Sequence, residues 1–123
     1  MILLDEGIEL VDKNRVVRIR LGIDTQGNPY LSLNGTDGRE RIILSVDDDG
    51  NGSLGFRAAN GQPTVTLGVS SDLGLGMMLL DVQSEICLTL SIADSKGEIR
   101  LDTKQGVHSW PTPDEKPRPV EGA

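Results

Sequence analysis

The chain contains almost no aromatic residues. Its only large rings are Tyr30, Phe56 and Trp110, which make up 2% of the 123 residues. Any apolar interior must therefore consist of Leu, Ile, Val and Met. Because ligand and catalytic pockets are usually lined by aromatic side chains together with a few converging polar groups, this composition does not favour an enzyme. We expect no catalytic residues and no cofactor.

Cysteine and histidine are also scarce, with Cys87 and His108 as the single examples. One cysteine excludes an internal disulfide and leaves the redox compartment open. The two residues are the only candidates for a nucleophile and its base, but Cys87 falls on an expected strand. His108 follows the last expected strand, beside Trp110. Nothing in the spacing brings the thiol and the imidazole together.

Cations are outnumbered, since 12 Lys and Arg face 19 Asp and Glu, for a net charge of −7 and a pI of about 4.6. Phosphate binding needs a cationic footprint, so nucleic acid is not an expected partner. The first ten residues are acidic where a signal peptide is basic, and no apolar run approaches membrane-spanning length. These features predict no membrane partner and a cytoplasmic location by default, with the compartment otherwise unknown.

The main positive feature is an internal repeat of about 23 residues. Reading the chain at that interval gives columns of similar residues. A fixed period of this length indicates stacked copies of one supersecondary unit, none of which buries its apolar face alone. The clearest columns are Leu21, Leu44, Leu67 and Leu90; Ile19, Ile42, Val65 and Leu88; Gly22, Ser45, Gly68 and Ser91; and Leu10, Leu33, Phe56 and Leu79.

The pattern of each repeat predicts a β-hairpin. Apolar and other residues alternate with period two in 41–46 and 64–69, as in half-buried strands. The pairs Asp37-Gly38 and Asn60-Gly61 suit two-residue type I′ turns. Such turns place Leu33 opposite Ile42, and Phe56 opposite Val65. Turns of the same length at 83–84 and 14–15 predict two further hairpins. The first places Leu79 opposite Leu88. The second places Leu10 opposite Ile19 and Glu9 opposite Arg20.

The pattern predicts an all-β protein, an antiparallel meander of tandem hairpin repeats over residues 1–110, followed by a Pro-rich flexible tail over 111–123. About nine strands are expected, and the sheet must cover its aliphatic face as a sandwich, an open barrel or an intertwined homo-oligomer, with a trimer as one form. A β-solenoid would give the same columns. The expected strands are 1–10, 16–23, 30–34, 41–46, 53–57, 64–69, 76–80, 86–92 and 98–101.

The proposed turns give the sheet two different ends. Tight turns lie at one end, and longer connections at the other bring acidic residues to a common rim: Asp24, Asp47, Asp48, Asp49, Asp72 and Asp94. Within that rim, Asp47, Asp49, Asn51 and Gly52 match the first half of a calcium loop, with oxygen ligands at alternate positions before a glycine turn. The ninth and twelfth positions, Gly55 and Ala58, lack ligands. Calcium binding is therefore the lesser interpretation, beside a solvated acidic turn.

The face opposite the aliphatic one carries arginines at Arg18, Arg20, Arg39, Arg41 and Arg57. They are candidates for binding an anionic glycan, or for the acidic Asp114 and Glu115 of a neighbouring subunit. The simpler interpretation is cross-strand charge pairing.

Residues 17–54 resemble tandem segments common in uncharacterised bacterial and phage-related proteins, with a pattern near R-x-x-L-x-V-x-x-D-G-x-x-x-L-x-L-x-D-x-x-G. The resemblance extends over about 8–101 and implies a repeated β scaffold without assigned functional residues. We therefore expect a non-enzymatic structural or protein-interaction module that forms a homo-oligomer. The alternative is a calcium- or glycan-binding module that uses the acidic rim.

Overall fold

A computed structural model describes residues 7–70, 74–81, 83, 85–93 and 96–111. Ten strands and no helix occur within the described residues. The strands are β1 (Ile8–Val11), β2 (Val17–Ile23), β3 (Pro29–Asn34), β4 (Glu40–Val46), β5 (Gly52–Arg57), β6 (Pro63–Ser70), β7 (Gly74–Leu80), β8 (Cys87–Ala93), β9 (Lys96–Thr103) and β10 (Gly106–Trp110). Residues 1–6 and the 112–123 part of the expected tail lie outside this description.

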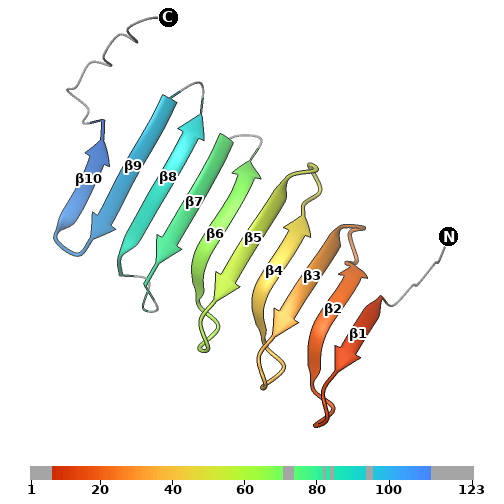
Figure 1. Cartoon of the computed structure of the whole chain (residues 1–123). Helices are drawn as coiled ribbons and strands as arrows, with labels where there is room; N and C mark the ends of the chain where they lie inside the picture. Colours follow the sequence, from red (N-terminus) through yellow and green to blue (C-terminus); the bar gives the residue numbers. More distant parts are fainter. Residues whose placement is uncertain (1–6, 71–73, 82, 84, 94–95, 112–123) are drawn as a thin grey trace, which may run out of the picture.

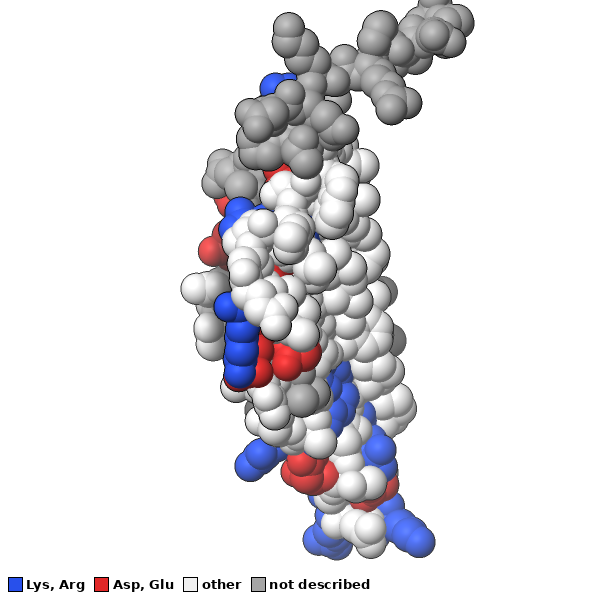
Figure 2. All heavy atoms as spheres, turned by 90° about the vertical axis from the view of Figure 1, so that its left-hand side faces the viewer, with Lys and Arg blue, Asp and Glu red and all other residues white. Residues whose placement is uncertain are grey.

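All ten strands form one antiparallel sheet in which spatial order equals sequence order. The sheet is open: β1 and β10 lie at opposite edges, and among the described residues no second layer covers either face (Figure 1). Viewed onto the β10 edge, the molecule has the narrow profile of a single layer (Figure 2). The predicted hairpin meander is confirmed, and the β-solenoid alternative is wrong because every neighbouring pair is antiparallel.

The predicted strand register is also confirmed. Leu33 pairs with Ile42, Phe56 with Val65, and Leu79 with Leu88. At the first hairpin, Leu10 pairs with Ile19 and Glu9 with Arg20. A shift by one residue would move every apolar side chain to the other face, so the alternation, together with the positions of the turn residues, was sufficient to predict the register.

The prediction for the C-terminal strands was incomplete. The expected strand 98–101 is longer, Lys96–Thr103, and a tenth strand follows at Gly106–Trp110. His108 and Trp110 therefore lie within the sheet and pair with Leu101 and Ile99. The sequence pattern did not predict this strand because Val107, His108 and Ser109 do not alternate in hydrophobicity.

The predicted contrast between tight and long turns is wrong. Five consecutive connections, at both ends of the sheet, are the same five-residue turn: 12–16, 24–28, 35–39, 47–51 and 58–62. In each, the first residue donates its N–H to the carbonyl of the fifth, and the fourth donates to the carbonyl of the first. Only the fourth residue has a positive φ, whereas a type I′ turn needs two such residues.

The 23-residue period reflects two unequal strand-and-turn units. The positive-φ residues lie at 15, 27, 38, 50 and 61, so successive turns are 12, 11, 12 and 11 residues apart. The longer unit contains a register shift after the turn, seen in the β1–β2, β3–β4 and β5–β6 pairs. The β2–β3 and β4–β5 pairs have none. The extra bulge residue keeps the apolar residues on one face.

Aspartates hold most of these turns by accepting backbone N–H groups. Asp12 Oδ1 accepts the N–H groups of Asn14 and Val16, and Asp24 and Asp47 repeat this arrangement in their own turns. The hydrogen bond from Val16 N–H is the main cause that lowers the pKa of Asp12 below its ordinary value of 3.8. The repeated D-x-x-G signal is therefore the chemistry of a turn.

The positive-φ position gives a direct test of turn strain. Gly50 has φ +84° and no atom within 4 Å of the site of a Cβ, so Gly50→Ala should destabilise the fold by about 1–2 kcal/mol through the left-handed backbone alone. Arg15 has φ 63° at the equivalent position, so Arg15→Gly should relieve backbone strain and should destabilise the protein less than Gly50→Ala does. Chemical denaturation of both variants measures this, and an unchanged Gly50→Ala protein would contradict the turn assignment.

Candidate functional site: the exposed aliphatic face

One face of the sheet carries two continuous rows of apolar side chains, which we call the aliphatic face. The rows follow from cross-strand pairing, because a residue and its partner project on the same side. The first row is Leu10, Ile19, Leu33, Ile42, Phe56, Val65, Leu79, Leu88, Leu101 and His108. The second is Ile8, Leu21, Leu31, Leu44, Leu54, Leu67, Met77, Leu90, Ile99 and Trp110.

Burial in this sheet is the reverse of that in a globular domain. Within the described residues, no hydrophobic side chain is buried. The buried residues are polar, Ser32 and Asn34, which are 2% and 9% exposed on the face opposite the aliphatic rows. Leu44 is 51% exposed and Leu67 47%. A contiguous apolar surface of this extent marks a binding surface or an aggregation site in a soluble protein.

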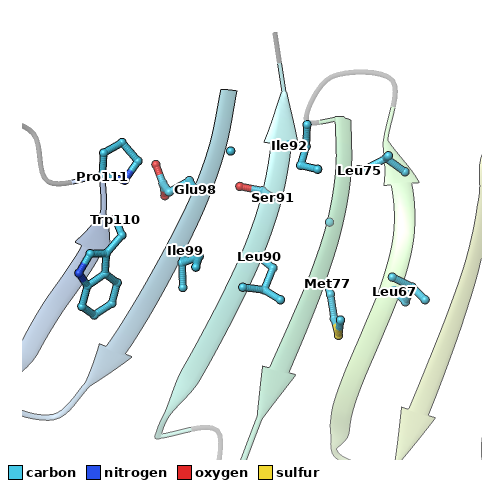
Figure 3. A pocket seen from close by; sticks show the side chains of 12 residues that line it. Leu67, Leu75, Met77, Leu90, Ser91, Ile92, Glu98, Ile99, Trp110 and Pro111 are labelled. Carbon is cyan, nitrogen blue, oxygen red and sulfur yellow. The ribbon is translucent and has the colours of Figure 1, made fainter. Parts of the chain in front are cut away.

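The aliphatic face is hollowed near its C-terminal edge (Figure 3). A trough of about 580 Å³ crosses β6 to β10, between the second apolar row and a shorter row formed by Leu75 and Ile92. The indole of Trp110, 49% exposed, forms its outer end. Its lining is almost wholly apolar, and Glu98 is its one charged residue. The trough therefore offers hydrophobic contact without a set of converging polar groups.

The opposite face carries the predicted arginines, several of which are paired within the chain. Arg20 lies 2.8 Å from Glu9, Arg41 lies 2.8 Å from Asp37, and Arg18 lies 3.4 Å from Asp12. Arg18 and Asn34 also join β2 to β3 through backbone carbonyls. The pairing predicted between strands is thus present for Glu9 and Arg20. These contacts leave Arg39 and Arg57 without an ion pair inside the described sheet.

The predicted acidic rim is present in its N-terminal half. Asp24, Asp47, Asp48 and Asp49 line an open depression of about 400 Å³ between the 24–28 and 47–51 turns. The Asn28 amide donates to Asp48 and links the two turns. Asp72 and Asp94 lie outside the described residues, as do Asp114 and Glu115.

The proposed calcium ligands lie together in one turn, but Asp47 has a structural task there. Its Oδ1 accepts the N–H groups of Asp49 and Asn51, at 3.0 and 2.9 Å. Within the described part of the chain, no group of three or more His, Cys, Asp or Glu side chains is arranged to hold a metal ion. Calcium binding at Asp47, Asp49 and Asn51 stays a prediction.

Cys87 and His108 project from opposite faces of the sheet. Cys87 pairs with Asp102, whereas His108 pairs with the adjacent Leu101. The Cys87 thiol contacts the Thr89 hydroxyl at 3.6 Å, and the His108 ring stacks on Trp110 at 6.5 Å between centroids. The sheet thus keeps the thiol and the imidazole apart.

Comparison with known proteins adds no functional assignment. No family model, no curated protein and no solved structure matches this chain. No helix in the described residues is long and apolar enough to cross a membrane. The aliphatic face, defined by its own geometry, is the strongest candidate for a functional surface.

Proposed function

We propose that the protein is a non-enzymatic structural module that assembles with further copies of itself through the aliphatic face. The observation that carries the proposal is the absence of any buried hydrophobic side chain among the described residues. Burial of apolar surface is the main favourable term in folding. A lone sheet leaves every member of both apolar rows at least partly in water, so it gains only part of that term and a partner would complete it.

A second copy fits this face better than a different partner does. The two rows are nearly uncharged and continue across all ten strands, so the surface complements itself. Aliphatic sheet faces pack at a separation of about 10 Å with strands nearly aligned. Ten strands at about 4.8 Å spacing and about 20 Å length give a face of roughly 850 Å², and stable interfaces bury about 800 Å² per partner.

The test is the native mass in solution, measured by light scattering over a range of protein concentrations, with and without a chelator. We expect a dimer or higher homo-oligomer with the same mass in both conditions. A compact, stable monomer at micromolar concentration would overturn the proposal, because the aliphatic face would then tolerate water.

The alternative function is calcium or glycan binding at the acidic rim, favoured by the depression that Asp24 and Asp47 line. It predicts a melting temperature that rises with millimolar calcium and an effect that disappears in Asp49→Asn. Asp49 is the informative residue because its side chain makes no hydrogen bond within the described turn, whereas Asp47 supports the turn itself.

A further inference from the structure

The two ends of the sheet carry opposite unpaired charges in the N-terminal half. At one end, Asp24, Asp47, Asp48 and Asp49 make no ion pair within the described residues. We call them the acidic rim. The other end carries the 12–16, 35–39 and 58–62 turns. There, four cations and one anion, Glu40, likewise lack an ion pair in the described sheet, so the unpaired charges are predominantly positive. The four cations are Lys13, Arg15, Arg39 and Arg57, which we call the basic rim.

From these charges we infer that two copies pack their aliphatic faces with strands antiparallel, so that the acidic rim of one copy lies over the basic rim of the other. This inference rests on the proposed self-association and specifies its geometry. A two-fold axis that lies between the faces and runs across the strands produces this arrangement. Each strand then stacks over the same strand of the partner copy, with its direction reversed.

Strand order makes the two rims interdigitate in this arrangement. The 47–51 turn lies between β4 and β5, whereas the turns at the opposite end lie between β3 and β4 and between β5 and β6. Reversal therefore places Asp48 and Asp49 of one copy between the turns that bring Arg39 and Arg57. In the same way, Asp24 falls between the turns that bring Arg15 and Arg39.

The competing two-fold axis runs parallel to the strands and is disfavoured by charge. It stacks β1 over β10 and puts each end of the sheet over the same end of the partner. The acidic rim of one copy then lies over the β6–β9 half of the partner, not over the basic rim. The described charges nearest that end of β9, Lys96 and Glu98, cancel, so this axis lacks the opposite charges that the reversed arrangement provides.

Cross-linking distinguishes the two axes. In a Cys87→Ser background, Leu33→Cys places one thiol on the aliphatic face of β3. With strands reversed, β3 stacks over β3 of the partner, and a bis-maleimide with a reach of about 10 Å should link the two copies. With the competing axis, β3 stacks over β8, and the thiols lie about 24 Å apart along the sheet. Thr66→Cys, on the opposite face, is the control that should not link.

Charge reversal tests the rims themselves. Asp48→Lys with Asp49→Lys should weaken self-association about tenfold, as should Arg39→Glu with Arg57→Glu, given the energies of exposed ion pairs. All four substitutions in one chain should restore it, because opposite charges again face each other. Asp47 is left unchanged because its carboxylate holds the turn.

The outcomes separate this inference from the proposed function. A monomeric wild-type protein would overturn both. An oligomer that gives no Leu33→Cys cross-link, that is trimeric, or that ignores charge reversal would overturn the strand-reversed dimer and leave self-association intact.

Discussion

Leu67→Glu should abolish assembly and, with it, the folded state. Leu67 lies in the second apolar row near the middle of the aliphatic face and is 47% exposed in the single chain. If another copy covers this face, the substitution places an unpaired carboxylate in an apolar interface, at a cost of several kcal/mol. We expect at least a hundredfold weaker self-association, measured by light scattering and by circular dichroism at the same concentration.

Thr66→Glu is the matched control for that variant. Thr66 neighbours Leu67 on β6, is also exposed, and projects from the opposite face. In an isolated sheet both positions face water, so the two variants should behave alike. Only a covered aliphatic face makes Leu67→Glu severe and Thr66→Glu mild. Equal, small effects would contradict assembly through this face.

The melting temperature should depend strongly on protein concentration. Because the described residues bury no hydrophobic side chain within one chain, dissociation and unfolding should occur together. Unfolding of a dimer to two unfolded chains loses about 1.4 kcal/mol of apparent stability for each tenfold dilution. For a folded unit of this size, we expect a fall of about 4 °C per tenfold dilution.

Differential scanning fluorimetry and circular dichroism over a hundredfold concentration range measure this shift. The Leu67→Glu protein serves as the reference, since its signal should be that of an unfolded chain throughout. A wild-type melting temperature that stays constant over the range would mean that a single chain is stable with its aliphatic face in water.

The strand register was predictable because its physical basis is local. Period-two alternation along 41–46 and 64–69 assigns each side chain to a face, and a shift by one residue would invert that assignment. The turn type was not predictable in the same way. Asp37 and Gly38 suit a type I′ turn by composition, but the Asp37 carboxylate accepts the Arg39 N–H instead. A five-residue turn with a bulge then preserves the same pairing.

For the acidic rim, too, the sequence predicted part of the arrangement and only the structure showed the rest. Repeat spacing placed Asp24 and Asp47 at one end of the sheet, and the structure brings both into one depression. The resemblance of 47–52 to a calcium loop did not reveal that Asp47 already accepts two backbone N–H groups. Only atomic positions show which oxygens of a carboxylate are already in use.

By itself, the sequence determined the strand order, the register and the two continuous apolar rows, because consecutive hairpins are short-range structures set by alternation and turn residues. Only the tertiary structure decided that the sheet stays open and single-layered, that β10 adds Trp110 to the aliphatic face, and that the opposite face holds the buried residues. Whether a sheet closes depends on its summed twist and curvature over all ten strands, which no local pattern specifies. That openness leaves the aliphatic face exposed in the single chain.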